Sequence, residues 1–531
     1  MQWCQTPHLS YRSSNTTLQK RSEKNMASIV YSFTINGIDG QLIHVEADTI
    51  CGYPSVSIVG LGDTAVKESK ERIEAAISFC GFQFPEQKLI VNLAPSHLKK
   101  SGTHFDLPIA IALLIRTNQV KVSVSSFALI GELSLNGEIR PIVGVLPMAI
   151  SAQENNIEHL IVAAENVAEA SLVKGIQVVG CETLHKAIYF LKTGSYSKTT
   201  PLPPDKKSTA LIDLDFRDVI GQQTLIQYLT VAAAGGHNFL MVGPPGCGKS
   251  MIAKRIPSIL PPMTEIESLE VTKIYSVANL LQQGGLINTR PFRAPHHNAS
   301  TNALIGGGHF SMPGEISLAH NGVLFLDEIA EFPKKTLDAL RQPMEDRKVT
   351  ISRVRSTNCY PANFMLVAAM NPCPCGYYGQ DKCRCTDYEI LKYRNKISGP
   401  ILDRFDFQKY VSSVNFFENR AGTTPTEEIF DLVKKARILQ QVRYQETSIG
   451  CNAELTPALI KRYCQLDHES DALLKKAYQH YQYSGRTVHK FLKIARTFAD
   501  LEGSHAIRKK DLTAALLSRD IDREKNRLLT V

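Results

Sequence analysis

Three short runs of apolar residues stand out in the middle of the chain, at residues 238–243 (NFLMVG), 322–328 (GVLFLDE) and 364–372 (FMLVAAMNP). Each run is continuous rather than alternating, which is typical of strands buried on both faces of a parallel sheet. Each run also ends in polar residues, and open α/β sheets bind their ligands at the carboxyl ends of their strands. The pattern predicts an α/β domain with a parallel-sheet core over residues 211–410.

The apolar pattern changes to a helical period beyond about residue 410. Within residues 426–442, apolar side chains recur every three or four positions behind a Pro-Thr-Glu-Glu start. The positions expected on one face are Ile429, Leu432, Val433, Ala436 and Leu439. A similar segment, residues 489–503, stops at Gly503. We therefore expect residues 411–531 to form an all-helical bundle.

The first third of the chain mixes strand and helix patterns. Residues 88–95 (KLIVNLAP) predict a buried strand, and residues 159–180 predict a strand, a helix and a strand. Two strand-like runs flank Asn136-Gly137, a dipeptide typical of two-residue hairpin turns. A Pro-, Ser- and Lys-rich stretch follows. The predicted organisation is an α+β domain at residues 26–195 and a linker at residues 196–210.

Length, composition and charge set the broad class of the protein. The 531 residues suit about three domains, and 43% hydrophobic residues are enough for sizeable cores. No apolar run approaches the ~20 residues of a membrane span, and residues 1–25 contain no apolar stretch typical of a secretory signal.

Residues 1–25 are interpreted as a disordered tail or as sequence ahead of a true start at Met26. We expect a cytoplasmic protein. The net charge of +9 suits a polyanionic partner, or simply a solvated basic surface.

The segment after the first apolar run, GPPGCGKS, matches the G-x-x-x-x-G-K-[ST] phosphate-binding pattern. Its lysine is expected to reach the β- and γ-phosphates, and its serine to bind Mg²⁺. The predicted nucleotide site consists of Gly243, Pro244, Pro245, Gly246, Cys247, Gly248, Lys249, Ser250 and Met251. Asp327 and Glu328 end the second run, where Asp327 would hold Mg²⁺ and Glu328 would activate the attacking water. The two motifs predict hydrolysis of ATP with Mg²⁺.

Three further polar residues fit an ATPase with a site between subunits. Asn371 ends the third run and is expected to position the water beside Glu328. Arg404, in the turn sequence LDRFD, makes either a surface ion pair or, at a subunit boundary, a contact with the neighbouring γ-phosphate. Arg486 opens a helix and is expected to sense the γ-phosphate when the helical domain folds over the nucleotide.

Four of the 12 cysteines cluster in the loop after Asn371, NPCPCGYYGQDKCRC. They are Cys373, Cys375, Cys383 and Cys385. Four thiolates can complete a tetrahedral Zn²⁺ site without histidine, although C-x-C pairs are tighter than the usual C-x₂₋₄-C pairs. Disulfides are disfavoured in the cytosol. The pattern favours a structural zinc site over four free cysteines.

A basic stretch, RKVTISRVRST, precedes the third apolar run. Its alternation predicts a hairpin that carries Arg347, Lys348, Arg353 and Arg355. Such side chains grip DNA phosphates without reading bases. They also serve as a charged hairpin edge that prevents unwanted strand pairing. The sequence leaves both interpretations open.

The order of these motifs resembles AAA+ ATPases of the magnesium-chelatase-like, helix-2-insert group. Two more specific segments, RPFRAPHHNASTNALIGGG and PGEISLAHNGVLFLDEIAEF, resemble the ComM/YifB family of bacterial proteins, as does the cysteine loop. The resemblance runs from about Met26 to the C-terminus and implies a hexameric ring that drives ATP-dependent branch migration of DNA in natural transformation. It also assigns roles: Walker A at residues 243–250, Walker B at Asp327 and Glu328, sensor 1 at Asn371, the trans-acting arginine finger at Arg404, and sensor 2 at Arg486.

The N-terminal domain resembles the Lon protease domain through VNLAPSHLKKSGTHFDLPIAIALL and LNGEIRPIVGVLPMAISA. Proteolysis of this type needs a serine nucleophile activated by a lysine. The nucleophile position falls on His104 and the lysine position on Leu146. We therefore expect a module for interaction or DNA handling without protease activity.

The function expected from the sequence is a homo-oligomeric, ring-forming motor that acts on single-stranded or branched DNA without sequence preference and without a membrane. One alternative is the motor subunit of a magnesium-chelatase-type complex, although the Lon-like domain and the cysteine loop are not expected in that subunit. An ATP-dependent protease is a second alternative, which His104 and Leu146 oppose. The intact nucleotide motifs oppose a non-enzymatic scaffold.

Overall fold

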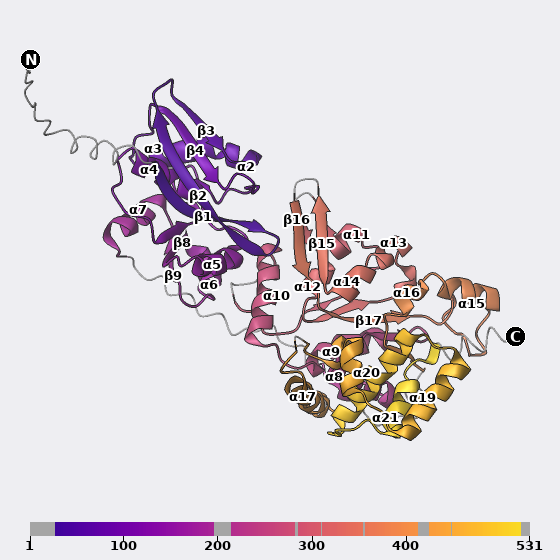
Figure 1. Cartoon of the computed structure of the whole chain (residues 1–531). Coiled ribbons are helices and arrows are strands. Elements are labelled where there is room, and N and C mark those ends of the chain that lie inside the picture. The colour runs from indigo at the N-terminus through magenta and orange to yellow at the C-terminus, as the bar shows by residue number, and fades with distance from the viewer. Residues whose placement is uncertain are drawn as a thin grey trace, which may run out of the picture. The chain divides into compact units, whose positions relative to one another are not determined.

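The computed structural model describes residues 27–195, 214–281, 285–308, 311–353, 356–412, 424–447 and 449–521. It divides into two compact units, whose boundary in the sequence lies between residues 204 and 205 (Figure 1). The predicted tail at residues 1–25 and the predicted linker at residues 196–210 lie outside the described residues. In the part of the chain described, no helix combines the length and apolar character needed to cross a membrane.

The first unit is built on a seven-stranded mixed sheet with the order β3-β4-β2-β1-β5-β8-β9. β2 pairs antiparallel with both β1 and β4, and the other neighbours are parallel. The strands are β1 (Ser28–Asn36), β2 (Asp39–Ile50), β3 (Ser55–Val59), β4 (Lys88–Ala94), β5 (Phe127–Leu129), β8 (His159–Ala163) and β9 (Gln177–Cys181). The helices are α2 (Thr64–Lys67), α3 (Ser69–Phe79), α4 (Asp106–Arg116), α5 (Val145–Glu154), α6 (Val167–Ala170) and α7 (Leu184–Thr193), with a short 3₁₀ turn η1 (Ala164–Asn166). These elements confirm the predicted strand at residues 88–95 and the predicted strand, helix and strand at residues 159–180.

The core of the first unit forms around α4. Residues 106–114 of this helix are all buried, because α4 packs against β1, β2 and α3. A helix that is apolar on every side belongs in the middle of a domain rather than on its surface. β4 contributes every second residue, Leu89, Val91 and Leu93, to the same core.

The predicted hairpin at Asn136-Gly137 joins β6 (Glu132–Leu133) to β7 (Ile139–Arg140). The backbone N–H of Ser134 donates to the carbonyl of Glu138 at 2.9 Å, so the loop inside this closing pair has three residues, 135–137, rather than the expected two. Gly137 occupies the last loop position with a φ of 73°. A three-residue loop of this kind needs a left-handed residue there, and glycine adopts that conformation without strain.

The second unit contains a five-stranded parallel sheet with the order β11-β14-β17-β10-β18. The three predicted apolar runs are confirmed as the three central strands, and every residue in them is buried. The strands are β10 (Phe239–Val242), β11 (Phe292–Arg293), β14 (Val323–Leu326), β17 (Met365–Met370) and β18 (Phe407–Tyr410). The sheet confirms the predicted α/β core.

Helices and small hairpins surround this sheet. The helices are α8 (Gln223–Gly235), α9 (Lys249–Ile259), α10 (Glu265–Val277), α11 (Thr301–Ile305), α12 (Glu315–Leu318), α13 (Lys334–Asp338), α14 (Arg341–Asp346), α15 (Asp387–Arg394) and α16 (Gly399–Leu402), with 3₁₀ turns η2 (Phe216–Asp218) and η3 (Ile329–Glu331). The hairpins are β12 (Gly306–Gly307) with β13 (Met312–Pro313), and β15 (Lys348–Arg353) with β16 (Ser356–Pro361). The second hairpin confirms the one predicted in the basic stretch.

The described residues from 424 to 521 are helical, as predicted. Their elements are α17 (Thr426–Arg443), η4 (Asn452–Glu454), α18 (Pro457–Tyr463), α19 (His468–Tyr481), α20 (Gly485–Leu501) and α21 (Lys509–Leu516). α20 ends just before Gly503, which has a φ of 68°. The β15–β16 hairpin and these helices lie on opposite sides of β17 (Figure 1).

The buried face of α17 is narrower than predicted. Three of the five expected positions are buried, namely Ile429, Val433 and Ala436. Leu432 and Leu439 are instead 43% and 39% exposed, so this part of the prediction is wrong. Gln440 turns inward in place of Leu439, because its side-chain amide donates to the carbonyl of Ala234 on α8 at 3.1 Å.

A polar network around Asp406 ties α20 to the sheet. Asp406 lies just before β18, and its carboxylate contacts His237 Nδ1 at 3.3 Å, the Asn238 N–H at 3.2 Å and Lys490 Nζ at 3.2 Å. His237 also contacts α20 directly, because its Nε2 lies 2.9 Å from Thr497 Oγ1. Burial alone would raise the pKa of Asp406, but Lys490 and His237 hold it well below its ordinary value. The C-terminal helices are therefore fixed against the amino ends of β10 and β18.

Replacing Asp406 with asparagine should lower the free energy of unfolding of the second unit by about 3 kcal/mol, because Lys490 would stay largely buried without a carboxylate partner. Urea denaturation followed by circular dichroism measures the change. The matched control is Asp403→Asn, at an exposed position three residues earlier, which should cost less than about 0.5 kcal/mol. Equal losses in the two variants would contradict the anchoring role of Asp406.

Candidate functional site

The glycine-rich segment after β10 forms a tight loop that leads directly into α9. Gly246 and Gly248 have φ values of 77° and 87°, which glycine adopts without strain. Gly243 has no room for a side chain, because a Cβ there would lie 2.5 Å from the carbonyl oxygen of Val411. The strand, loop and helix therefore form the cradle of backbone N–H groups that the sequence motif predicts.

Four of the predicted site residues meet at the carboxyl ends of β10, β14 and β17. Lys249 Nζ donates to the carbonyl oxygens of Gly243 at 2.7 Å and Pro244 at 2.9 Å, and lies 3.4 Å from Asn371 Oδ1. The next residue, Ser250, contacts the Walker B aspartate, since its Oγ donates to the Asp327 carboxylate at 2.6 Å. The oxygen pair of serine and aspartate is the hard donor set that Mg²⁺ prefers.

Glu328 lies beside this cluster in a strained conformation. Its φ of 48° places a non-glycine residue in the left-handed region, a feature that is enriched at functional sites. Its side chain is 55% exposed, and Oε2 lies 3.7 Å from His297 Nδ1. The Glu328 carboxylate is thus accessible to a water molecule at the edge of the nucleotide loop.

The contact of Glu328 with His297 was not foreseen from the sequence. His297 follows β11, and β11 pairs with β14, the strand that leads to Glu328. A signal was present, because polar residues just after neighbouring parallel strands meet at one edge. The very short β11, which has only two residues, hid that signal.

Cys247 and Met251 complete the predicted nucleotide segment. Burial raises the pKa of the Cys247 thiol, so it remains protonated at neutral pH and serves as a small filler. Met251 is 39% exposed on the first turn of α9.

A second group of charged residues lies at the opposite edge of the five-stranded sheet. A cavity of about 900 Å³ is lined there by residues that stand directly before strands: Asn238 before β10, Gly322 before β14 and Asp406 before β18. Arg404 and Arg486 line the same cavity, whereas none of the described residues lining it belongs to the nucleotide segment 243–251. In a parallel sheet this amino edge is remote from the nucleotide loop.

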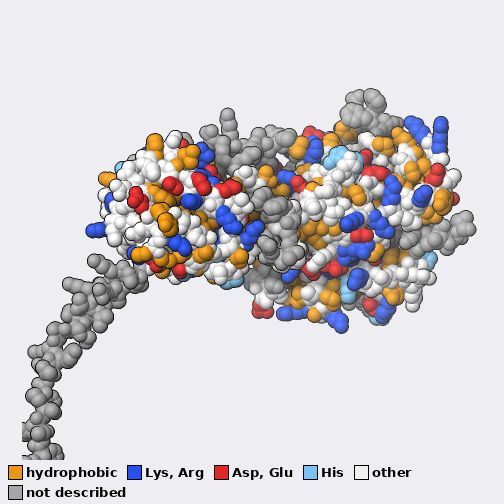
Figure 2. All heavy atoms as spheres, turned by 90° about the horizontal axis from the view of Figure 1, so that it is seen from above, with side chains coloured by type: hydrophobic (Ala, Val, Ile, Leu, Met, Phe, Trp, Pro, Cys, Tyr) orange, Lys and Arg blue, Asp and Glu red, His pale blue; other side chains and the backbone are white. Residues whose placement is uncertain are grey.

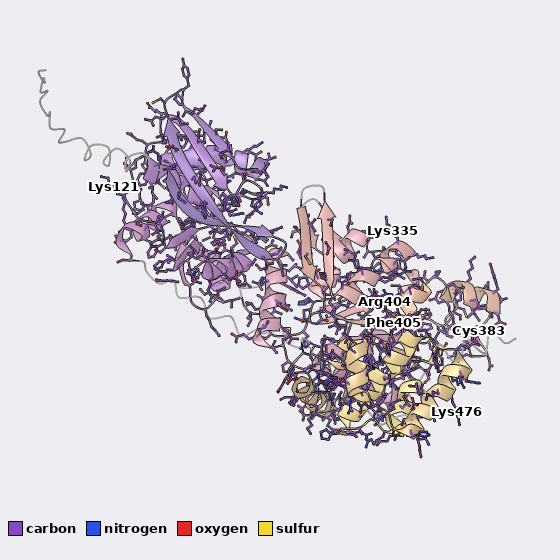
Figure 3. All side chains as sticks on the ribbon, in the orientation of Figure 1. Lys121, Lys335, Cys383, Arg404, Phe405 and Lys476 are labelled. Carbon is purple, nitrogen blue, oxygen red and sulfur yellow. The ribbon has the colours of Figure 1, made fainter. Side chains whose placement is uncertain are left out.

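The structure places Arg486 at this amino edge, where α20 is held and Arg486 is exposed. The expected role of Arg486 at the γ-phosphate stays a prediction. Arg404 lies beside Phe405 (Figure 3), and its guanidinium donates to the carbonyl oxygen of Pro400 on α16 at 2.7 Å. Its side chain is 15% exposed and pairs with Glu345 at 2.6 Å, the ion pair that is common for an arginine in a turn. Neither arginine approaches the Lys249 cluster of the same chain.

The four clustered cysteines converge to a single point beside the nucleotide loop. Their sulfur atoms all lie within 4.8 Å of one another, with Sγ–Sγ distances of 3.3, 3.9 and 3.7 Å among Cys373, Cys375 and Cys383. A tetrahedral ion with metal–sulfur bonds of about 2.3 Å separates its ligands by about 3.8 Å. The sulfurs are too far apart for a disulfide, whose S–S bond is about 2.05 Å. Cys383 lies near α15 (Figure 3), and the donor set fits a thiolate-bound metal.

The basic hairpin is less available for DNA than its sequence suggests. Arg347, at the base of β15, pairs with Glu454 and donates to Asn363 Oδ1 at 3.1 Å, so its charge is used within the second unit. Lys348 is exposed. Arg355 and the side chain of Arg353 lie outside the described residues. On the face drawn in Figure 2, basic side chains are interspersed with acidic and apolar ones rather than gathered in one patch.

The positions that would carry a serine–lysine dyad in the first unit are unsuited to proteolysis. His104 is buried, and burial lowers its pKa to about 4, so it is a neutral imidazole. Leu146 is buried in α5. The nearby Lys100 is also buried, which lowers its pKa, and its ammonium donates to the carbonyl of Pro95. This lysine is already engaged and has no serine partner among the described residues.

Three family models match successive parts of the chain. The model described as magnesium chelatase, subunit ChlI, matches residues 215–418. A model of subunit ChlI of Mg-chelatase matches residues 45–166, and the ChlI C-terminal model matches residues 423–519. The match at residues 45–166 lies in the first unit. The presence of that unit is therefore not evidence against a chelatase subunit, contrary to the expectation from the sequence.

Full-length relatives narrow the family further. The chain is 40% identical to the YifB protein of Salmonella typhimurium over 503 residues, which cover 93% of this chain and 97% of that protein. It is also 40% identical to the competence protein ComM of Haemophilus influenzae, over 92% of this chain and 96% of ComM. The Lon protease of Trichlorobacter lovleyi is 27% identical over 152 residues, which cover 27% of this chain and 18% of that protease. The chain therefore belongs to the ComM/YifB family of magnesium-chelatase-like AAA+ ATPases.

Proposed function

We propose that the protein is an ATP-hydrolysing, ring-forming motor that moves branched DNA. The observation that carries the proposal is the division of the polar residues between two edges of one sheet. Lys249, Ser250 and Asp327 lie at the carboxyl edge, whereas Arg404 and Arg486 line the cavity at the amino edge. A site divided in this way is complete only when the carboxyl edge of one copy faces the amino edge of the next. Such head-to-tail contacts generate rings, and we propose a hexamer.

The chain's own residues supply binding and proton transfer. On nucleotide binding, Lys249 exchanges its two carbonyl partners for the more strongly accepting phosphate oxygens. Ser250 and Asp327 would hold Mg²⁺, which would supply positive charge to the phosphates. Asn371 orients the attacking water, and Glu328 accepts its proton. The exposed, left-handed position of Glu328 keeps its carboxylate free for that transfer.

The two arginines act on the nucleotide of the neighbouring copy. In the isolated chain Arg404 is neutralised by Glu345, and the γ-phosphate of the neighbour replaces that carboxylate in the ring. Arg486 is exposed at the start of α20 on the same cavity and adds a second cation. Positive charge placed against the developing negative charge of phosphoryl transfer accelerates the reaction by about 10³–10⁵-fold in related systems.

DNA is the proposed substrate of the motor. The support is the 40% identity to a protein named for competence and the projecting β15–β16 hairpin with its exposed Lys348. A hairpin of this kind in each copy would line the centre of a ring and hold phosphates without reading bases. We propose single-stranded or branched DNA as the partner and the cytoplasm as the location.

A chelatase motor remains the second candidate, because all three matching family models carry the chelatase name. That function requires partner subunits that bind a porphyrin. Retention of the protein on immobilised branched DNA, with no retention by a chelatase partner, favours the DNA motor; the reverse result favours the chelatase. A protease is opposed by the neutral, buried His104 and by Leu146.

Zinc is the proposed structural metal of the cysteine loop. Four sulfur donors in a tetrahedral spacing match the preference of Zn²⁺, which is bound in this way in many structural sites. Iron binds similar cysteine sets. The metal would cross-link the two C-x-C pairs. Cys375, the last residue of the first pair, and Cys383, the first residue of the second pair, are eight positions apart in the sequence.

The Glu328→Gln variant should bind ATP with wild-type affinity and lose hydrolysis by at least about 100-fold, because the amide cannot accept the proton of the attacking water. Phosphate release measures turnover, and equilibrium binding of a fluorescent nucleotide measures affinity. Glu331→Gln, three residues later and paired with Lys396, is the matched control and should retain turnover. Normal turnover of Glu328→Gln would refute the assignment of the base.

A synthetic four-way junction tests the coupling of hydrolysis to DNA. Wild-type protein with ATP should migrate the branch, while wild-type protein without ATP and Glu328→Gln with ATP should not. Hydrolysis that is not stimulated by DNA and leaves the junction unmoved would eliminate the DNA motor while leaving the ATPase intact.

Protein purified without a histidine tag should contain about one zinc per chain, because four thiolates bind this ion far more tightly than buffer does. Inductively coupled plasma mass spectrometry measures the content and distinguishes zinc from iron. A fully active preparation with well under one zinc per chain would reject the zinc proposal.

A further inference from the structure

The cysteine loop turns back on the nucleotide site at both of its ends. It begins at Asn371, which contacts Lys249, and ends at Cys385, immediately before α15. The last turn of α15 returns to the start of the loop, since Arg394 Nε donates to the carbonyl oxygen of Pro372 at 3.2 Å. Tyr393 interacts with the backbone of Asn371, and burial raises its pKa to about 12. The loop and α15 thus form a closed unit anchored at Asn371.

The middle of the loop packs directly on the nucleotide loop. Gly376 has a φ of 84°, and a Cβ at this position would lie 2.7 Å from Cδ of Pro245 and 3.9 Å from Cγ of Asn371. Real Cβ atoms do not approach other atoms to 2.7 Å, so the backbone at Gly376 lies closer to Pro245 than any other residue type allows. Pro245 is one of the residues that shape the phosphate cradle.

The path of the cysteine loop depends on turns rather than on regular secondary structure. Backbone N–H groups of Gly376 and Cys383 donate to the carbonyls of Cys373 and Gln380 at 3.0 and 2.9 Å. Only Cys373 of the four cysteines is fully buried, and the rest of the loop is largely polar. A loop that buries so little apolar surface needs a cross-link to hold one shape.

The position of α15 extends the influence of the loop to the hydrolytic residues. α15 lines a cavity of about 880 Å³ together with Glu328 and Asn371. A displacement of the cysteine loop would therefore move two parts of the site: α15, which lines the cavity beside Glu328, and Pro245. The loop contacts the nucleotide site from the phosphate side and from the side of the attacking water.

We propose that the metal held by the four cysteines braces the nucleotide-binding loop, so that metal occupancy sets the affinity for nucleotide. The proposal rests on the nucleotide site and the zinc site proposed above. The metal fixes the turn from Cys373 to Gly376, Gly376 holds Pro245, and Pro245 holds the phosphate cradle. The cysteine loop and the nucleotide loop are thus joined at Gly376 by an apolar contact, in addition to the polar contact of Asn371 with Lys249.

A pair of glycine variants tests the contact without touching a thiol. Gly376→Ala should keep about one zinc per chain and weaken binding of a fluorescent ADP by at least about tenfold, which corresponds to about 1.4 kcal/mol. Gly379→Ala is the matched control: it has a φ of 82° in the same loop, but nothing lies within 4 Å of its Cβ position. It should bind ADP within about twofold of wild type, although its backbone strain is similar. Equal affinities in the two variants would overturn the proposed brace.

A pair of cysteine variants tests the role of the metal. Cys383→Ser should lose zinc and bind ADP more weakly, whereas Cys359→Ser, at an exposed cysteine on β16 outside the cluster, should change neither. Loss of zinc with unchanged ADP affinity would overturn the proposal. A wild-type protein that contains zinc but binds no nucleotide would instead refute the proposed ATPase, so the two failures are distinguishable.

Discussion

The carboxylate of Asp406 holds the C-terminal helices at one edge of the nucleotide-binding sheet. It contacts His237 and Asn238 before β10 and Lys490 on α20, and all of these groups are largely removed from water. To swing over the nucleotide loop of its own chain, α20 would have to leave this network and expose an unpaired carboxylate and ammonium. Breaking a buried ion pair costs about 3–5 kcal/mol. The position of Arg486 at the amino edge follows from this constraint, which supports the proposal that a second copy completes the site.

Two of the cations proposed to bind phosphate, Lys249 and Arg404, already have weaker partners in the isolated chain. Lys249 is held by two backbone carbonyls, and Arg404 by the carboxylate of Glu345, which is 59% exposed. Phosphate oxygens replace these partners at modest cost, because exposed ion pairs and neutral acceptors contribute little. The cations are thus positioned before the nucleotide arrives, and their geometry changes little on binding. In the proposed ring, Arg404 would couple nucleotide binding to contact between neighbouring copies.

Local sequence patterns predicted the local structure well. The continuous apolar runs identified β10, β14 and β17, and the phosphate-binding motif located the loop before Lys249, because these features depend on residues close together in the chain. The predicted buried face of α17 was wrong where distant segments compete: Gln440 is buried in place of Leu439, because it donates to a carbonyl on α8. The position of Arg486 at the amino edge depends on the Asp406 network and is not visible in the local sequence either. No local pattern reports the contact of Gly376 with Pro245, since it joins residues 131 positions apart.

Mixing two inactive variants tests most directly whether neighbouring copies complete the nucleotide site. Glu328→Gln retains Arg404 and Arg486 but lacks the base, whereas Arg404→Ala retains the base but lacks the arginine. Differently tagged variants are mixed, and mixed assemblies are isolated by two affinity steps. If neighbouring copies complete the site, the mixed assemblies should hydrolyse ATP at up to about a quarter of the wild-type rate, since a random head-to-tail arrangement pairs an intact base with an intact arginine at about one site in four. Mixed assemblies that form but stay inactive, or an Arg404→Ala protein that is fully active alone, would contradict it.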